Sequence, residues 1–287
     1  IEEQSNIREY ISQMAPLHIC NFVISNGKFS VEPALPTNAD GSLKQESVPI
    51  SALFTAGNII EDTFAVNYLE ADERHNFRAV MTYREGAKNQ LPEQRSMMVH
   101  WADAGDEFNQ AKMETFDMSS FCTYREHAFI VARYLLSVRR RITHTVSFKT
   151  TPEGLYLAPG QYIRVITKAS PNVSYDNGVI DAAGNVTSLG ATLAGTYDIF
   201  AYRAGDPDVR LTTLTVANGV TTDATLFNSL FTVRNNSTNC NIYQVDQITM
   251  DEDGLVDIQA SHFPCDSNLR SLIVQDVLDP ARYTVLD

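Results

Sequence analysis

The sequence predicts a mainly β protein with a minor α component, an α+β chain in which one long helix packs on a sheet. Three observations lead to this fold class. Apolar and polar residues alternate in several stretches, as in sheets with one solvated face. Turn-forming residues separate these stretches. Only one segment shows the spacing of a long amphipathic helix. With 287 residues, the chain is long enough for two domains or one large β domain.

The N-terminal region predicts a short helix followed by a hairpin. Residues 5–15 form the helix, which ends at Pro16, and "SNGK" at 25–28 is the turn between two strands. Asn-Gly readily adopts the positive φ angles that a tight hairpin needs. The helix places four apolar residues on one face: Ile7, Tyr10, Ile11 and Met14.

Three more strands are predicted between residues 59 and 101, because apolar side chains recur there at every second position. The recurring residues are Phe64, Val66 and Tyr68 in the first strand and Phe77, Ala79, Met81 and Tyr83 in the second.

Residues 123–140 predict the long helix. Thr123 and Glu126 have the spacing of a capping box, in which each side chain satisfies a free amide of the first turn. The buried stripe is expected to consist of Tyr124, Ala128, Val131, Leu135 and Val138.

The helix ends in three adjacent arginines, Arg139, Arg140 and Arg141. Guanidinium groups there complement the partial negative charge of the last carbonyls, which stabilises a helix by about 0.3–1 kcal/mol for each charge. A phosphate site is the less favoured alternative, because a basic run needs wider basic surroundings to bind phosphate.

The second half of the chain returns to strands. Alternation resumes at Ile142, His144, Val146 and Phe148, and short strands with turn residues follow between 171 and 235, with one or two helical turns at 223–231. The last two elements are a hairpin over 240–262 and a strand at 271–278, "SLIVQDVL".

The hairpin turns at residues 251–254. Pairing Met250 with Leu255 sets Cys240 opposite Cys265, so a disulfide is conceivable. A one-residue slip would remove this match, and two reduced thiols are therefore the favoured interpretation.

Together these elements suggest four segments: a helix-plus-hairpin segment (1–55), a β domain with the long helix (56–170), a small β domain (171–239), and a closing hairpin with a C-terminal strand (240–287).

The charge of the chain limits its partners. Its net charge of −13 argues against general nucleic-acid binding, which needs a cationic surface. No run of about 18 apolar residues indicates a membrane span. The chain begins at Ile1 without a signal-like segment, so we expect a fragment of a longer polypeptide.

No group of residues predicts a catalytic, cofactor or metal site. Residues 38–41 and 251–254 resemble pieces of calcium loops but lack the register of an EF-hand and are interpreted as turns. Acidic pairs at 61–62 and 72–73 are interpreted as surface charges, since sequence cannot fix their separation.

Sequons at Asn172, Asn185, Asn235 and Asn236 mean little without a secretory signal. The six histidines fit no triad or metal pattern: His18, His75, His100, His127, His144 and His262. The sequence therefore favours a structural or assembly protein over an enzyme.

Residues 116–165, "FDMSSFCTYREHAFIVARYLLSVRRRITHTVSFKTTPEGLYLAPGQYIRV", resemble the central tail-tip hub proteins of long-tailed bacteriophages, the tip attachment or host-specificity proteins. In that family a helix leads into a pattern like "RRxTHTV.F.T.P.GL.LAPGD.I.V". Gln161 stands where an acid is expected, which matters little for the fold. The ending "YQVDQITMDEDGLVDIQASHFPCD" also resembles the closing strand pair of this module.

The resemblance implies tube-like or hub-like β-barrel or sandwich domains in a virion protein at the distal end of the tail, assembled in the host cytoplasm. It further implies a homotrimeric ring that caps or continues the tail tube, lets DNA pass without binding it, and contacts distal tail, tube, tape-measure and fibre proteins. In such a trimer the arginines gain a second possible use, as cross-subunit salt-bridge donors, ranked below the helix end.

The alternative is a receptor-binding or carbohydrate-binding β module at the tail tip. It needs exposed aromatic side chains in a groove, and the candidates are Tyr156, Tyr175, Tyr197 and Tyr202. A cell-wall hydrolase is a third possibility, but the sequence shows no acid/base pair for it.

Overall fold

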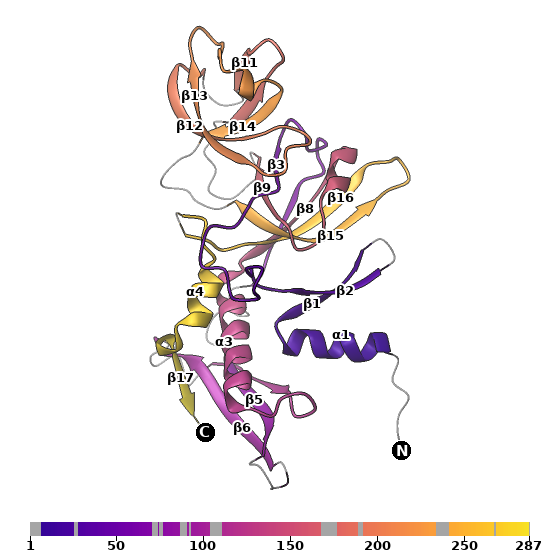
Figure 1. The fold of residues 1–287 in the computed structure, drawn as a ribbon, viewed down its shortest axis with the longest axis vertical. Coiled ribbons are helices and arrows are strands. Elements are labelled where there is room, and N and C mark those ends of the chain that lie inside the picture. The colour runs from indigo at the N-terminus through magenta and orange to yellow at the C-terminus, as the bar shows by residue number, and fades with distance from the viewer. Residues whose placement is uncertain are drawn as a thin grey trace. The chain divides into compact units, whose positions relative to one another are not determined.

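The computed structural model describes residues 7–25, 28–70, 74, 77–86, 91, 93–103, 111–167, 177–188, 192–233, 241–266 and 268–286. The fold is mainly β with a minor helical component, which confirms the predicted class (Figure 1). Two compact units divide the chain. Unit 1 consists of Ile1–Gln45, Leu69–Thr143 and Ser271–Asp287, and unit 2 consists of Glu46–Tyr68 and His144–Arg270. The four segments expected from the sequence remain a prediction.

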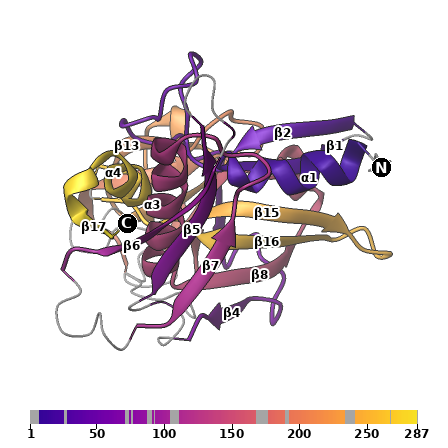
Figure 2. The same cartoon turned by 90° about the horizontal axis from the view of Figure 1, so that it is seen from below.

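The main sheet of unit 1 has four strands in the order β17-β6-β5-β7, and helix α3 packs on it (Figure 2). The bounds are β5 (Arg78–Glu85), β6 (Glu93–Trp101), β7 (Met113–Asp117), α3 (Arg125–Arg141) and β17 (Tyr283–Leu286). The predicted alternation is confirmed in and just before β5, where Phe77, Ala79, Met81 and Tyr83 are all buried. These side chains and the apolar face of α3 form one core.

Helix α3 begins two residues later than predicted, and the capping box does not form. Its N-cap is Tyr124, whose side chain makes no capping hydrogen bond. Glu126 is therefore the second helical residue instead of the third, too close to the N-cap for the reciprocal pair. The buried stripe also differs, because Tyr124 is exposed while Leu136 is buried.

The first helix and the first hairpin of unit 1 form as predicted, with small differences. Helix α1 (Ile7–Leu17) includes Pro16 instead of ending before it, and β1 (Cys20–Ser25) pairs with β2 (Lys28–Pro33). The strand pair is a sheet of its own. Ile7 and Tyr10 lie exposed, so the predicted apolar face of α1 is only partly covered.

The predicted strand at 271–278 is wrong, because these residues form helix α4 (Leu272–Leu278). The Ser271 hydroxyl oxygen accepts a hydrogen bond from the Val274 amide, a standard N-cap. Ile273, Val274 and Val277 then fall on one helical face and are buried. The following turn, η4 (Pro280–Arg282), leads into β17, which is the C-terminal strand of the chain.

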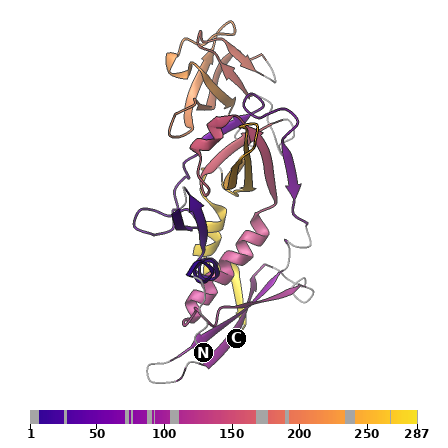
Figure 3. The ribbon, with the colours of Figure 1, turned by 90° about the vertical axis from the view of Figure 1, so that its right-hand side faces the viewer.

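Unit 2 contains two sheets. The strands of unit 2 are seen from a second side in Figure 3. The six-stranded sheet has the order β3-β9-β15-β16-β8-β4 and the five-stranded sheet has the order β11-β10-β14-β12-β13. The first sheet comprises β3 (Ala52–Thr55), β4 (Ala65–Tyr68), β8 (His144–Thr150), β9 (Tyr162–Ile166), β15 (Ile242–Met250) and β16 (Val256–His262). The second comprises β10 (Asn177–Ile180), β11 (Val186–Ser188), β12 (Gly195–Tyr202), β13 (Arg210–Val216) and β14 (Ser229–Val233). Two short 3₁₀ turns, η2 (Pro152–Tyr156) and η3 (Ala224–Leu226), connect strands.

The predicted register of the β15–β16 hairpin holds at one end only. Next to the turn, Met250 pairs with Val256 instead of Leu255. A bulge between Val245 and Gln247 then shifts the register by one. Beyond the bulge Tyr243 pairs with His262, which is the register that would set Cys240 opposite Cys265. Cys240 lies outside the described residues, so the pairing with Cys265 remains untested.

Glycine at position 178 is required by a close approach of two strands. A Cβ atom there would lie 2.0 Å from the Thr187 carbonyl oxygen of the paired strand β11. We expect Gly178→Ala to lower the free energy of unfolding by roughly 2 kcal/mol, since forced overpacking typically costs 1–3 kcal/mol. Urea denaturation monitored by circular dichroism measures it. Gly57→Ala is the matched control, because its Cβ would meet only ordinary contacts of 3.5 Å or more. Equal stability losses in the two variants would contradict the explanation.

Candidate functional site

The three arginines at the end of α3 each bind a different carboxylate. Arg139 binds Glu114 through two hydrogen bonds of 3.0 and 2.8 Å, and Arg140 binds Asp103 through two of the same lengths. Arg141 binds Asp276 of helix α4, at 2.8 and 3.0 Å. The arginines thus lie on the last turn of the helix, as predicted, and they also make ion pairs within unit 1 that the sequence did not indicate.

Asp276 is the most buried carboxylate of this group, with a side chain that is 0% exposed. It accepts hydrogen bonds from the Ser137 hydroxyl at 2.8 Å, from Arg141, and from the Arg282 guanidinium. A buried charge is tolerated when its lone pairs are satisfied in this way. Asp276 therefore fixes α4 and the turn before β17 to helix α3.

Two of the arginines also stack on aromatic rings. The Arg139 guanidinium carbon lies 4.8 Å from the centre of the Phe77 ring, and that of Arg140 lies 4.5 Å from the Trp101 ring. The Arg140 hydrogen bonds lower the pKa of Asp103 from its usual range. Because of these ion pairs and ring contacts, the arginine row (Arg139, Arg140 and Arg141) is part of the scaffold of unit 1.

Removing the Asp276 carboxylate tests this role. We expect Asp276→Ala to destabilise the protein by roughly 3 kcal/mol, because it leaves two guanidinium groups without their buried partner. Asp103→Ala is the control and should cost less than about 1 kcal/mol, since exposed ion pairs contribute little. Chemical unfolding gives both values. A loss for Asp276→Ala as small as for Asp103→Ala would refute the structural role.

The structure brings histidines together in two places that the sequence did not predict. In unit 2, the rings of His144 and His262 stack with centres 4.7 Å apart, and His144 Nε2 lies 3.1 Å from the Tyr243 hydroxyl. In unit 1, the rings of His18 and His127 lie 4.8 Å apart. Partial burial and the nearby His127 lower the pKa of His18.

His127 and His100 each contact a backbone carbonyl group. His127 Nε2 donates a hydrogen bond to the Leu17 carbonyl oxygen at 2.8 Å, and His100 Nδ1 lies 2.8 Å from the Trp101 carbonyl. His75 lies outside the described residues. Within the described part of the chain, no group of three histidine, cysteine or acidic side chains is arranged to hold a metal ion.

The acidic stretches considered as metal loops form turns. Gly41 and Gly254 both have positive φ angles, of 82° and 79°. Asp40 accepts hydrogen bonds from the amide and the hydroxyl of Ser42, at 2.9 and 2.6 Å. Asp251 accepts hydrogen bonds from the amides of Asp253 and Leu255, at 3.1 and 2.9 Å, and pairs with Lys149 at 2.7 Å. Both carboxylates therefore organise turns.

The Lys149 ion pair predicts how the hairpin turn responds to acid. The hydrogen bond from Lys149 holds the pKa of Asp251 below its ordinary value. The ionised Asp251 carboxylate therefore contributes its full stabilisation above the unfolded-state pKa of about 3.9. This stabilisation is lost as the pH falls through the lower folded-state pKa of Asp251. We expect Asp251→Asn to reduce the loss of stability below pH 4, measured by thermal unfolding. Lys149→Gln should have the same effect. If both variants lose as much stability below pH 4 as the wild type, the ion pair does not cause the acid sensitivity.

The other sequence candidates that lie within the described residues have separate surroundings. Glu61 and Asp62 are exposed. The remaining acidic, tyrosine and sequon candidates outside the described residues are Asp72, Glu73, Tyr175, Asn172, Asn235 and Asn236.

Among the tyrosines proposed for sugar binding, Tyr156 is 84% exposed, whereas Tyr202 packs against the core of the six-stranded sheet. The Tyr197 hydroxyl donates to the Ala194 carbonyl oxygen at 2.8 Å. The Asn185 amide is used inside a turn, where it donates to Asp181 at 2.6 Å.

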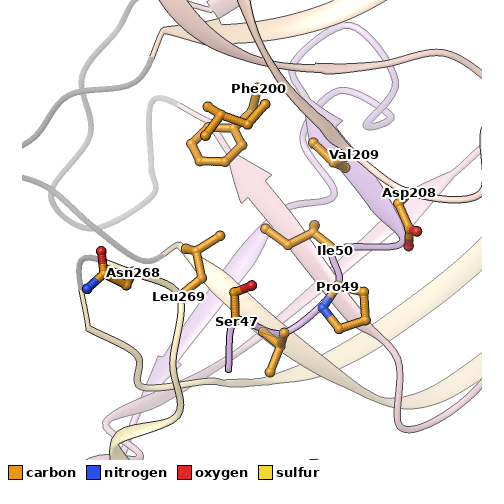
Figure 4. Close-up of a pocket in the computed structure, with 10 residues that line it drawn as sticks. Ser47, Pro49, Ile50, Phe200, Asp208, Val209, Asn268 and Leu269 are labelled. Carbon is orange, nitrogen blue, oxygen red and sulfur yellow. The ribbon is translucent and has the colours of Figure 1, made fainter. Parts of the chain in front are cut away.

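Unit 2 holds a pocket that the sequence did not predict (Figure 4). Its volume is about 390 Å³, and apolar side chains form most of its wall. The backbone closes it through hydrogen bonds from Val209 to Ile50 at 2.6 Å and from Val48 to Leu269 at 3.0 Å. Leu269 has a φ angle of 61°, which is unusual outside glycine. The lining residues are Ser47, Val48, Pro49, Ile50, Phe200, Asp208, Val209, Leu211, Asn268 and Leu269.

The chemistry of this pocket suits the burial of an apolar group. Among the described residues that line it, Asp208 is the one ionisable residue, and the Phe200 ring is covered by the Arg164 guanidinium at 4.2 Å. No local sequence signal marks it, because the lining comes from a loop at 47–50, from β12 and β13 and their connection, and from residues 268–269.

The comparisons with known proteins give the following results. No family model matches the sequence, and no curated protein matches it. One chain in the virion of a native gene transfer agent particle is similar in structure, with a TM-score of 0.48 and 12% identity over 92% of this chain and 40% of that chain. A tail protein from Neisseria meningitidis MC58 follows, with a TM-score of 0.40 and 10% identity over 94% and 58% of the two chains. The 43 kDa tail protein of prophage MuSo2 from Shewanella oneidensis has a TM-score of 0.37 and 9% identity over 93% and 57%.

This chain spans less than two thirds of the length of each of these proteins. In the part of the chain that the structure describes, no helix is both long and apolar enough to cross a membrane.

Proposed function

We propose that this chain is a structural, non-enzymatic component of a phage tail tip or baseplate hub. In this proposal three copies form a ring that caps or continues the tail tube, anchors receptor-binding parts, and lets DNA pass during delivery. The ring sits at the distal end of the tail in the virion. The resemblance of residues 116–165 to tail-tip hub proteins supports the assignment to the hub.

The observation that carries the proposal is an exposed apolar face on the first hairpin. Phe29 is 62% exposed and Val31 is 48% exposed, and both lie on the same side of β2. The Phe22 ring of the paired strand stacks on Phe29 with centres 5.6 Å apart. On the opposite face of β2 lie polar residues such as Ser30 and Glu32.

A hairpin of this kind is only marginally stable by itself. Its strands pair with no other described strand, and helix α1 beside it also exposes Ile7 and Tyr10. Exposed apolar surface of this type can form a protein–protein contact. In a ring of identical chains every copy buries the same face, and the ring has a fixed number of subunits when the rotation between neighbouring copies closes.

The overall charge supports the proposed conduit. The chain has 35 acidic and 22 basic residues, for a net charge of −13. A negatively charged wall repels the DNA backbone instead of retaining it. Passage without binding is the property that a tail channel requires.

The mass of the isolated protein tests the proposal. We expect sedimentation analysis to give the mass of three 31.9 kDa chains for the wild type. The double variant Phe29→Lys, Val31→Lys should sediment as a monomer, because charged side chains cannot be buried in the interface without a partner.

The control variant is Ser30→Lys, which places the same side chain on the opposite face of β2 and should leave the trimer intact. A wild-type monomer at all concentrations, or a trimer that persists in the double variant, would contradict the trimeric hub.

A further inference from the structure

We propose that unit 1 carries a docking site for an extended acidic segment of another protein, formed by the free edge of β7 and the pocket beside it. The site is separate from the first hairpin, to which the trimer contact is assigned above. Three features of unit 1 lead to this inference: a pocket with an apolar floor, an excess of positive charge around it, and an edge strand that has one partner among the described strands.

The pocket has a volume of about 430 Å³, which lies within the range of sites that bind a few side chains. Its floor is aromatic, with the Phe77 and Phe116 rings packed edge to face at a centre distance of 5.8 Å. The end of helix α3 provides the aliphatic wall. The apolar lining residues are Leu69, Phe77, Phe116, Leu135, Val138 and Ile142.

The charged lining of the pocket is mostly positive in a chain that is strongly negative. Arg74, Lys112 and Arg139 line it together with one carboxylate, Glu114. Arg139 binds that carboxylate through two hydrogen bonds, so Glu114 is already neutralised. The remaining positive charge belongs to Arg74 and Lys112.

These two cations are poorly paired. The Arg74 Nε atom is buried without a hydrogen-bond partner in the described part of the chain, which is costly unless a bound group satisfies it. Lys112 is 77% exposed and reaches Glu114 only at 3.9 Å. A carboxylate from outside would meet the exposed Lys112 ammonium group at a pocket that the Arg74 guanidinium also lines.

Strand β7 adds a hydrogen-bonding edge to this pocket. It is the last strand of its sheet and pairs only with β5 among the described strands. The Lys112 carbonyl and the Met118 amide bond toward β5, at 3.0 and 2.8 Å. Because backbone groups alternate in direction along a strand, the amide and carbonyl groups of Met113 and Thr115 point to the free edge.

Edge and pocket together match one mode of peptide recognition. An extended segment pairs with the edge strand through its backbone, and alternate side chains enter the adjacent pocket. Glu114 and Phe116 face this pocket from β7, while Met113 and Thr115 lie more exposed. The fitting partner is thus a strand with an apolar side chain and a carboxylate on the same face, two residues apart.

The probe is a fluorescent eight-residue peptide, blocked at both ends, in which threonine alternates with leucine and glutamate in turn. Anisotropy titration against the full chain should show saturable binding that weakens as salt increases. A peptide with lysine in place of glutamate should bind at least tenfold more weakly, since it meets like charges.

Two variants separate the charge and the backbone contributions. Lys112→Glu should weaken binding roughly tenfold by reversing an exposed charge at the pocket. Thr115→Pro should abolish binding, because it removes the outward amide, and proline is tolerated on edge strands. Lys28→Glu, an equal charge change on the distant hairpin strand β2, should bind like the wild type.

The outcomes decide the proposal. Unchanged thermal unfolding in Lys112→Glu and Thr115→Pro, together with weaker peptide binding, supports the docking site. No saturable binding by the wild type overturns it, and so does binding that is unaffected by both variants. If Thr115→Pro instead breaks up the protein's own oligomer, the edge is occupied by a second copy and the proposal is wrong. A trimer that persists while peptide binding is lost leaves the hub assignment intact and separates the two proposals.

Discussion

Unit 1 depends on one buried carboxylate. Asp276 lies on a short helix of two turns, α4, which has too few residues to be stable by itself. Its hydrogen bonds to Ser137 and Arg141 fix α4 against the long helix, and Arg282 binds it from the following turn. Strand β17 begins at the next residue and pairs with β6. The position of β17, at one edge of the sheet, therefore depends on Asp276 being hydrogen-bonded to residues of α3 that lie about 140 residues earlier in the chain.

The sequence predicted what depends on neighbouring residues. Side-chain alternation in β5 and β8 indicated both strands and their buried faces, since a period of two has no other common origin. The hairpin turn at Asp251 was recognised because aspartate and glycine there form hydrogen bonds within four residues. The mainly β class followed from these local patterns.

The failures have a different physical origin. The segment 271–278 has an apolar pattern that fits either a strand or a helix. Two interactions favour the helix: the N-cap by Ser271, and the ion pair of Asp276 with Arg141, which lies 135 residues away in the chain. The partners of the arginine row lie 25 to 135 residues distant, so no local pattern could reveal them. The same is true of the His144–His262 pair and of the pocket around Ile50, which strands from distant parts of the sequence assemble.

The order of the segments has a consequence for synthesis of the chain. Unit 1 is interrupted twice, and its last segment follows all of unit 2. Strands β5 and β6 leave the ribosome long before β17, so β6 keeps an open side while more than a hundred further residues are made. A nascent chain with an unpaired apolar strand is prone to misassembly. Both segments of unit 2 are complete before the last segment of unit 1 is made, so the closure of unit 1 by β17 is a late step.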